Sequence, residues 1–235
     1  MKILALESSA LAASAALCED GKCVGVYLQN CGLTHSETLL PMADNLLKGC
    51  RWTMDDVDLI AVAHGPGSFT GVRIGVSTAK GLSWGADKPC CGVSTLESMA
   101  WQGAHLKGRL LCCVMDARRN QVYNALFRAE GDGLTRLTED RALSLAELLP
   151  EIGEAPVLIG DGCRVTAAAM EAAGMDFTLA PEPIRIQSAW GVAMAAYHAP
   201  KESWGEPNPV YLRLSQAERD RLARMEHMKT EKENR

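Results

Sequence analysis

The chain has 235 residues, 47% of them hydrophobic and 23% charged, and its formal net charge is −5. This length allows one large domain or two small ones, each with a buried core, and the composition is that of an ordinary soluble globular protein. An acidic chain is not a typical nucleic-acid binder, so contact with DNA or RNA would need a local basic patch or a basic partner.

The N-terminal segment lacks the pattern of a signal peptide, and no apolar run is long enough to cross a bilayer. We therefore expect a cytoplasmic protein that contacts neither membrane nor DNA. The nine cysteines include no C-x-x-C pair, which favours buried, reduced thiols over zinc or disulfide sites.

The first hundred residues alternate between period-two and helical apolar patterns. The expected strands are 2–8, 14–18, 23–29, 57–65 and 88–96, and the expected helices are 34–49, 68–86 and 96–106. An antiparallel hairpin sheet extended by parallel strands is typical of a ribonuclease-H-like half.

The rest of the chain repeats this order imperfectly. The expected strands are 109–117, 118–129, one within 131–139, and 155–162, and the expected helices are 143–152, 165–174 and 186–199. Residues 201–216 are expected to be extended or looped because two prolines bracket Asn208. We therefore predict an α/β protein of two ribonuclease-H-like subdomains, with mixed sheets flanked by helices and a break near 103–108.

The predicted subdomains are 1–104 and 105–214. The last helix and tail of the second are candidates to pack back on the first. Residues 215–235 carry mixed charges and few apolar side chains, so we expect a charged, flexible tail.

The stretch "HGPGSFTGVRIG", from His64 to Gly75, resembles a phosphate-binding loop that opens a helix. It lacks the Gly-Lys-Ser/Thr of a Walker A loop, has Thr70 at the last glycine position of a dinucleotide fingerprint, and places Pro66 and Thr70 around Ser68 where a nucleophile elbow needs glycines. The interpretation that remains is a tight strand-to-helix turn.

Small residues recur at four-residue spacing along this helix, at Gly71, Gly75 and Ala79. Such a stripe lets another backbone come close. The neighbour is either the rest of the same subunit or a partner protein.

Motifs that run in order along nearly the whole chain resemble the TsaB (YeaZ) family of the actin/Hsp70/sugar-kinase superfamily. The matching segments are "LALESSALAASAAL", "HSETLLP" from His35, "HGPGSFTGVRIGVSTAKGL" from His64, "VMDARRNQVY" from Val114, "VLIGDG" from Val157 and "PVYLR" from Pro209. The resemblance implies two actin-like ATPase subdomains.

The resemblance also implies a function in forming N6-threonylcarbamoyladenosine (t6A) at adenosine 37 of tRNAs that read ANN codons. In that reading the chain is no enzyme. It is a scaffold or activator of the homologous catalytic subunit TsaD, together with the ATPase TsaE, and reaches tRNA through the complex. The alternatives are a nucleotide-dependent ATPase or kinase of the same fold and, less favoured, an M22-type metallopeptidase.

The resemblance implies that subdomain 1–104 forms the dimer with TsaD or with a second copy. The predicted interface consists of His35, Leu39, Met42, Gly71, Val72, Arg73, Gly75, Val76, Ala79 and Lys80. On this hypothesis Gly75→Glu abolishes the dimer and leaves the chain folded.

Catalytic relatives bind a metal through two histidines spaced H-x-x-x-H on one helix face. Here His35 is followed four residues later by Leu39, so the second ligand is missing. We expect no metal.

A vestigial nucleotide site is predicted at Glu7, Ser8, Ser9 and Asp116. Glu7 is one methylene longer than the aspartate common in the family. The loop after Asp116, "ARRNQ", lacks the glycines that let backbone amides approach a phosphate, which favours an ion pair or a turn between Asp116 and Arg118. No cofactor is expected, and weak or partner-shared ATP or ADP binding stays open.

Overall fold

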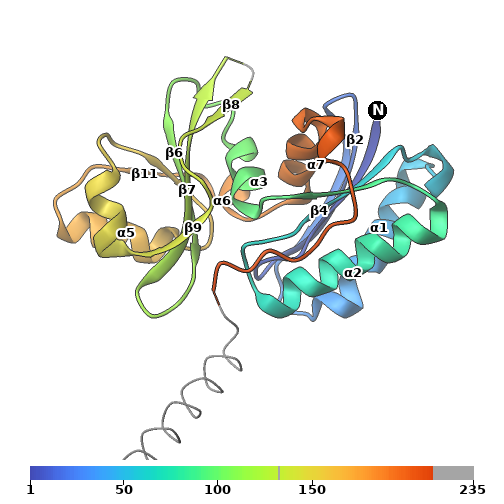
Figure 1. Cartoon of the computed structure of the whole chain (residues 1–235), viewed down its shortest axis with the longest axis horizontal. Coiled ribbons are helices and arrows are strands. Elements are labelled where there is room, and N and C mark those ends of the chain that lie inside the picture. The colour runs from blue at the N-terminus through green and yellow to red at the C-terminus, as the bar shows by residue number, and fades with distance from the viewer. Residues whose placement is uncertain (132, 214–235) are drawn as a thin grey trace, which may run out of the picture.

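The computed structural model of the chain describes residues 1–131 and 133–213. The chain forms two mixed sheets flanked by helices, which confirms the predicted fold class (Figure 1). The predicted tail, 215–235, lies outside the described residues. Among those described, no helix is long and apolar enough to span a membrane.

The first half follows the predicted order closely. Its elements are β1 (Lys2–Glu7), β2 (Ala13–Glu19), β3 (Lys22–Gln29), α1 (His35–Cys50), β4 (Leu59–Ala63), α2 (Phe69–Ala86), β5 (Cys90–Val93) and α3 (Thr95–Gln102). The sheet order is β3-β2-β1-β4-β5. Strands β1, β2 and β3 pair antiparallel, whereas β4 and β5 extend the sheet in parallel.

The second half repeats this arrangement. Its elements are β6 (Leu110–Asp116), β7 (Gln121–Glu130), β8 (Gly133–Arg136), β9 (Arg141–Ser144), α4 (Leu145–Leu148), β10 (Val157–Ile159), α5 (Cys163–Ala172), β11 (Thr178–Leu179), α6 (Glu182–Arg185) and α7 (Ala189–His198). The order β11-β10-β6-β7-β8 mirrors the first sheet, with β6 in the place of β1. The carboxyl ends of β1 and β6 are therefore equivalent positions in the two halves.

The two sheets are separated by helices that cross between the halves. Helix α3 contributes Leu96 and Met99 to the core of the second sheet, whereas α7 contributes Val192 and Ala196 to the core of the first. The two helices pack against each other between the sheets (Figure 1). The predicted boundary at residue 104 places α3 in the first subdomain because of its position in the chain. Its side chains, however, join the core of the second sheet.

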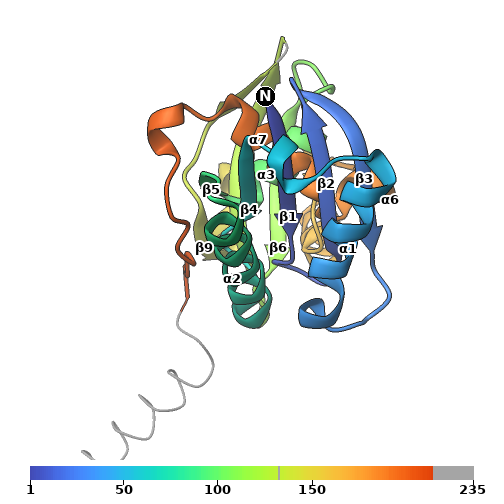
Figure 2. The same ribbon diagram turned by 90° about the vertical axis from the view of Figure 1, so that its right-hand side faces the viewer.

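Helices α1 and α2 cover the outer face of the first sheet, where Figure 2 shows them in front of the strands. Helix α5 packs on the outer face of the second sheet. This layering leaves one face of α1 and α2 without a neighbour among the described residues.

The predicted helix over 143–152 is only partly correct. The first two residues of the predicted helix belong to β9 (Arg141–Ser144), which pairs with β7, and helix α4 spans Leu145–Leu148, followed by a 3-10 helix over Leu149–Glu151. The Ser144 hydroxyl accepts the backbone N–H of Glu147 and so fixes the start of this helix inside the predicted segment. Strand β11 and helix α6 were not predicted, because elements this short carry no periodicity.

Residues 204–213, which we call the strap, run alongside the first sheet after α7. The N–H of Gly205 donates to the Cys90 carbonyl at 2.9 Å, and the N–H of Val210 donates to the His64 carbonyl at 2.8 Å. The guanidinium of Arg213 then donates to the carbonyl of Ala117 in the second half. The strap therefore connects the edge of the first sheet to the loop that follows β6.

Candidate functional site

A cleft of about 510 Å³ opens where the carboxyl ends of β1 and β6 face each other. Its walls come from the loops after these two strands, the start of α2 and the strap. The lining residues are Ser9, Ala10, Leu11, Gly67, Ser68, Phe69, Thr70, Met115, Asp116, Ala117, Arg118, Tyr123, Asp161, Val210, Tyr211, Leu212 and Arg213. In open α/β sheets ligands bind in the crevice outside the carboxyl ends of the strands, which makes this cleft the candidate ligand site.

In the loop after β1, a carboxylate at the end of the strand accepts a backbone hydrogen bond from the loop itself. Glu7 is fully buried, and its Oε1 accepts the N–H of Ser9 at 2.6 Å, while its Oε2 has no partner among the described residues. Burial raises the pKa of Glu7 to about 7, and hydrogen bonds from Ser9 oppose the rise. The Ser8 hydroxyl is also engaged, donating to the Gly71 carbonyl at 2.9 Å.

The equivalent loop after β6 contains the same kind of hydrogen bond between a carboxylate and a backbone N–H. The exposed Asp116 accepts the N–H of Arg118 through Oδ1 at 2.7 Å. Of the two predicted arrangements, the structure shows the turn. Arg118, Arg119 and Asn120 all have positive φ, from 57° to 62°, a conformation unusual for residues other than glycine.

A second carboxylate that lines the cleft, Asp161, follows β10 and was not predicted as a site residue. It accepts a hydrogen bond from Nε2 of Gln187 at 3.1 Å, and desolvation by the surrounding protein raises its pKa, although the residue keeps an exposed surface. The acidic residue two positions after the apolar run 157–159 was the signal that could have identified it.

Backbone donors of both loops are already engaged by carboxylates of the same loops. Phosphate cradles need backbone N–H groups that point at the ligand. Here the N–H groups of Ser9 and Arg118 already bind the carboxylates of their own loops. Glu7 and Asp116 therefore each engage one backbone donor of their own loop.

The histidine helix offers no metal centre. His35 Nε2 lies 2.8 Å from the Ala10 carbonyl, and Leu39 is 1% exposed in the core. Within residues 1–131 and 133–213, no group of three histidine, cysteine or carboxylate side chains has a geometry that could hold a metal ion.

The small-residue stripe faces the interior of the subunit, contrary to the interface prediction. A Cβ added at Gly71 would lie 2.1 Å from the Ser8 carbonyl oxygen, and one added at Gly75 would lie 2.5 Å from the Ser8 hydroxyl. Ala79 is fully buried. The stripe lets α2 approach the end of β1, so Gly75→Glu cannot be expected to leave the chain folded.

Most other predicted interface residues also belong to the subunit's own core. Leu39, Met42, Val72 and Val76 pack in the cluster beneath α1 and α2. Three remain at least partly accessible, namely His35, Arg73 and Lys80. Lys80 is paired with Glu206 of the strap at 2.7 Å.

A different stripe faces outward. Ser77, Gly81 and Gly85 are exposed at four-residue spacing, and a Cβ added at Gly81 or Gly85 would meet nothing within 4 Å. Beside them, the exposed fractions of Trp84 and of Leu40 on α1 are 77% and 49%. The interface itself stays a prediction, and these residues are its accessible candidates.

The fold and cleft define the class as a two-subdomain α/β protein of the actin-like ATPase type. A family model described as tRNA N6-adenosine threonylcarbamoyltransferase matches residues 20–219. The "tRNA threonylcarbamoyladenosine biosynthesis protein TsaB" of Bacillus subtilis is 38% identical over 154 residues, which are 66% of this chain and 67% of the relative.

The protein of the same name from Escherichia coli is 39% identical over 64% of this chain and 65% of its own length. A Pseudomonas aeruginosa crystal structure, described as similar to peptidase YEAZ, has a TM-score of 0.75 at 25% identity and covers 90% of this chain and 99% of its own. The chain belongs to the TsaB (YeaZ) family.

Proposed function

We propose that the chain is a non-catalytic subunit for threonylcarbamoylation of tRNA adenosine, acting in the cytoplasm with a TsaD-like transferase and a TsaE-like ATPase. The relatives at 38% and 39% identity carry the name of this biosynthesis, and the matching family model is that of the transferase. A scaffold that shares the fold of its enzyme can pack against it as one subunit packs against another.

The main support for a non-catalytic role is that a backbone N–H group in each of the two loops is already hydrogen-bonded to a carboxylate of the same loop. The carboxylate of Glu7 takes the Ser9 N–H at 2.6 Å, and Asp116 takes the Arg118 N–H at 2.7 Å. A phosphate that used these two amides would have to displace both carboxylates. The missing second histidine, replaced by buried Leu39, argues against the metallopeptidase alternative.

Measurements on the purified full chain test this proposal. We expect no ATP turnover above a protein-free blank and no stoichiometric metal after dialysis. ATP turnover at an enzymatic rate by the chain alone would favour the ATPase alternative. One tightly held metal ion per chain would favour the metallopeptidase.

We propose that the partner interface lies on the outward face of α1 and α2, around Leu40, Gly81 and Trp84. Exposed apolar side chains beside small residues allow close helix packing against a partner. The same face would serve the transferase homologue or a second copy of the chain.

The matched pair Gly81→Glu and Gly153→Glu tests this surface. Both glycines lack neighbours within 4 Å of an added Cβ, so both variants should fold. Gly81→Glu should prevent co-elution with the transferase homologue and reduce self-association, whereas Gly153→Glu, in the second half, should change neither. Unchanged co-elution of Gly81→Glu would place the interface elsewhere.

A further inference from the structure

The rim of the cleft concentrates positive charge in an acidic chain. Arg118 and Arg213 line the cleft, Arg119 follows Arg118 at the exposed tip of the β6–β7 turn, and Arg73 contacts the ring of Phe69. Among the residues that the structure describes, two carboxylates line the same cleft, Asp116 and Asp161. Each is engaged, Asp116 with the Arg118 amide and Asp161 with Gln187.

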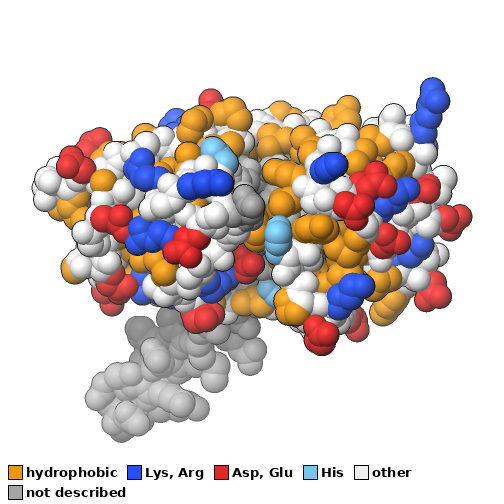
Figure 3. Space-filling view, turned by 90° about the horizontal axis from the view of Figure 1, so that it is seen from above, with side chains coloured by type: hydrophobic (Ala, Val, Ile, Leu, Met, Phe, Trp, Pro, Cys, Tyr) orange, Lys and Arg blue, Asp and Glu red, His pale blue; other side chains and the backbone are white. Residues whose placement is uncertain are grey.

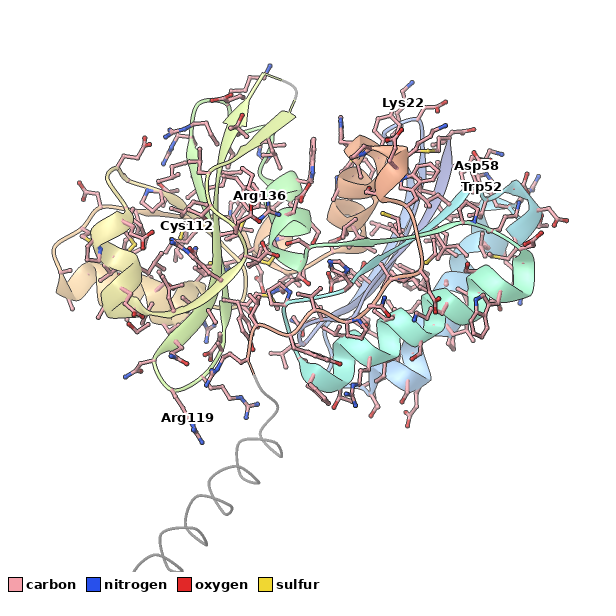
Figure 4. The ribbon with its side chains drawn as sticks, in the orientation of Figure 1. Lys22, Trp52, Asp58, Cys112, Arg119 and Arg136 are labelled. Carbon is pink, nitrogen blue, oxygen red and sulfur yellow. The ribbon has the colours of Figure 1, made fainter. Side chains whose placement is uncertain are left out.

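Arg118 and Arg119 are available for an anionic ligand. Both are exposed, and neither forms an ion pair with any residue in the described part of the chain. Figure 4 shows Arg119 pointing away from the body of the molecule, at the end opposite Lys22. The face at that opposite end shows basic and acidic side chains interspersed (Figure 3).

Two stacked aromatic rings line the same cleft as Arg118 and Arg213. Phe69 and Tyr211 stack with centroids 4.6 Å apart, and the Arg73 guanidinium lies 3.8 Å from the Phe69 centroid. The Nε of Arg73 also donates to the Tyr211 hydroxyl at 2.7 Å. Tyr211 remains 39% exposed, and both rings line the cleft.

Guanidinium groups for phosphates beside aromatic rings for bases form the combination by which proteins hold single-stranded nucleic acid. An acidic protein segment would use the arginines but not the rings. We propose that the cleft rim formed by Arg118, Arg119, Arg213 and the Phe69–Tyr211 stack binds a single-stranded RNA loop directly. This inference rests on the proposed function, because the RNA in question is the tRNA that the complex modifies.

The two kinds of contact predict separable effects. Each phosphate contact on single-stranded RNA contributes about 0.7 to the slope of log K against log salt. Each stacked base changes affinity by about 5- to 160-fold on removal of the aromatic side chain. Losing two arginines should therefore lower the salt slope by about 1.4, whereas losing the Tyr211 ring should weaken binding with little change in slope.

Fluorescence anisotropy with the full chain tests the proposal, using a labelled RNA stem-loop and a fully paired duplex of the same length. Arg118→Asn/Arg119→Asn removes both charges and keeps residues that tolerate positive φ. Tyr211→Leu removes the ring. Lys22→Asn/Lys48→Asn is the control, since it removes two exposed charges distant in sequence from the rim.

We expect the wild type to prefer the stem-loop, the arginine variant to bind about 10-fold more weakly with a lower salt slope, and the control to match the wild type. Four outcomes would overturn the proposal: no RNA binding at low salt, equal binding of duplex and stem-loop, equal loss in the control, or equally tight binding of polyglutamate. The last would assign the rim to an acidic protein.

A parallel modification assay separates this inference from the proposed function. If the chain binds no RNA but still stimulates the transferase homologue, the RNA-binding rim is rejected and the subunit role stands. If the chain neither binds RNA nor stimulates modification, both fail.

Discussion

The inward-facing glycines of α2 give the sharpest test of the packing described here, through the variant Gly71→Ala. The added Cβ would lie 2.1 Å from the carbonyl oxygen of Ser8, a backbone atom that cannot rotate away. Ordinary contacts of this type begin near 3.4 Å. Helix α2 or the end of β1 must therefore shift by roughly an ångström, in a core where strands and helices are closely packed.

Overpacking of this kind costs about 3 kcal/mol, the upper part of the usual range, because the obstacle is backbone. Replacing a helical glycine by alanine returns about 1 kcal/mol. The net loss is about 2 kcal/mol, which corresponds to a fall in Tm of about 4–8 °C for a protein of this size.

Gly81→Ala on the same helix is the matched control. Its Cβ meets nothing within 4 Å, so only the gain in helix propensity remains, up to about 1 kcal/mol, and Tm should rise. Thermal unfolding followed by circular dichroism compares the two variants with the wild type. A Gly71→Ala protein as stable as the wild type would refute the inward orientation of the stripe.

Two further predictions concern buried titratable groups. The pKa of Glu7 is about 7 in the fold, against 4.5 for a free side chain, so stability should decrease as pH rises from about 4.5 to about 7 and then level off. The loss of unfolding free energy is on the order of 3 kcal/mol. Urea titrations at several pH values should show a smaller pH dependence for Glu7→Gln than for the wild type. An identical pH profile would show that Glu7 is not buried as described. Burial raises the pKa of the Cys112 and Cys163 thiols to about 12, so a thiol reagent should label the exposed Cys23 and Cys31 first in the native chain. Labelling of all nine cysteines at one rate without denaturant would contradict that burial.

The sequence predicted the fold well where periodicity was long. Runs such as 57–65 and 68–86 carry enough apolar positions to define a buried strand and an amphipathic helix. Repetition of the same order then indicated two similar halves. The short elements β11 and α6 carry too few residues for either period to appear, and the predicted helix over 143–152 began too early because residues 143 and 144 are the end of β9.

The site was harder to predict because periodicity shows which residues share a face and not what that face meets. Gly71, Gly75 and Ala79 were correctly placed on one stripe, but only the position of Ser8 shows that the stripe packs inward. The loop carboxylates Glu7 and Asp116 were identified from their places after strands, whereas their bonds to the Ser9 and Arg118 amides depend on local backbone geometry. Tyr211 and Arg73 are 138 residues apart in the chain, so no sequence pattern could bring them together.

Reconstitution of tRNA modification by omission tests the subunit role most directly. The transferase homologue, the ATPase, the threonylcarbamoyl donor and unmodified tRNA are incubated with and without the full chain, and modified adenosine is quantified by mass spectrometry. We expect product only when the chain and the transferase are both present, and none from the chain without the transferase. Equal yields without the chain, or product from the chain alone, would contradict its assignment as a required, non-catalytic subunit.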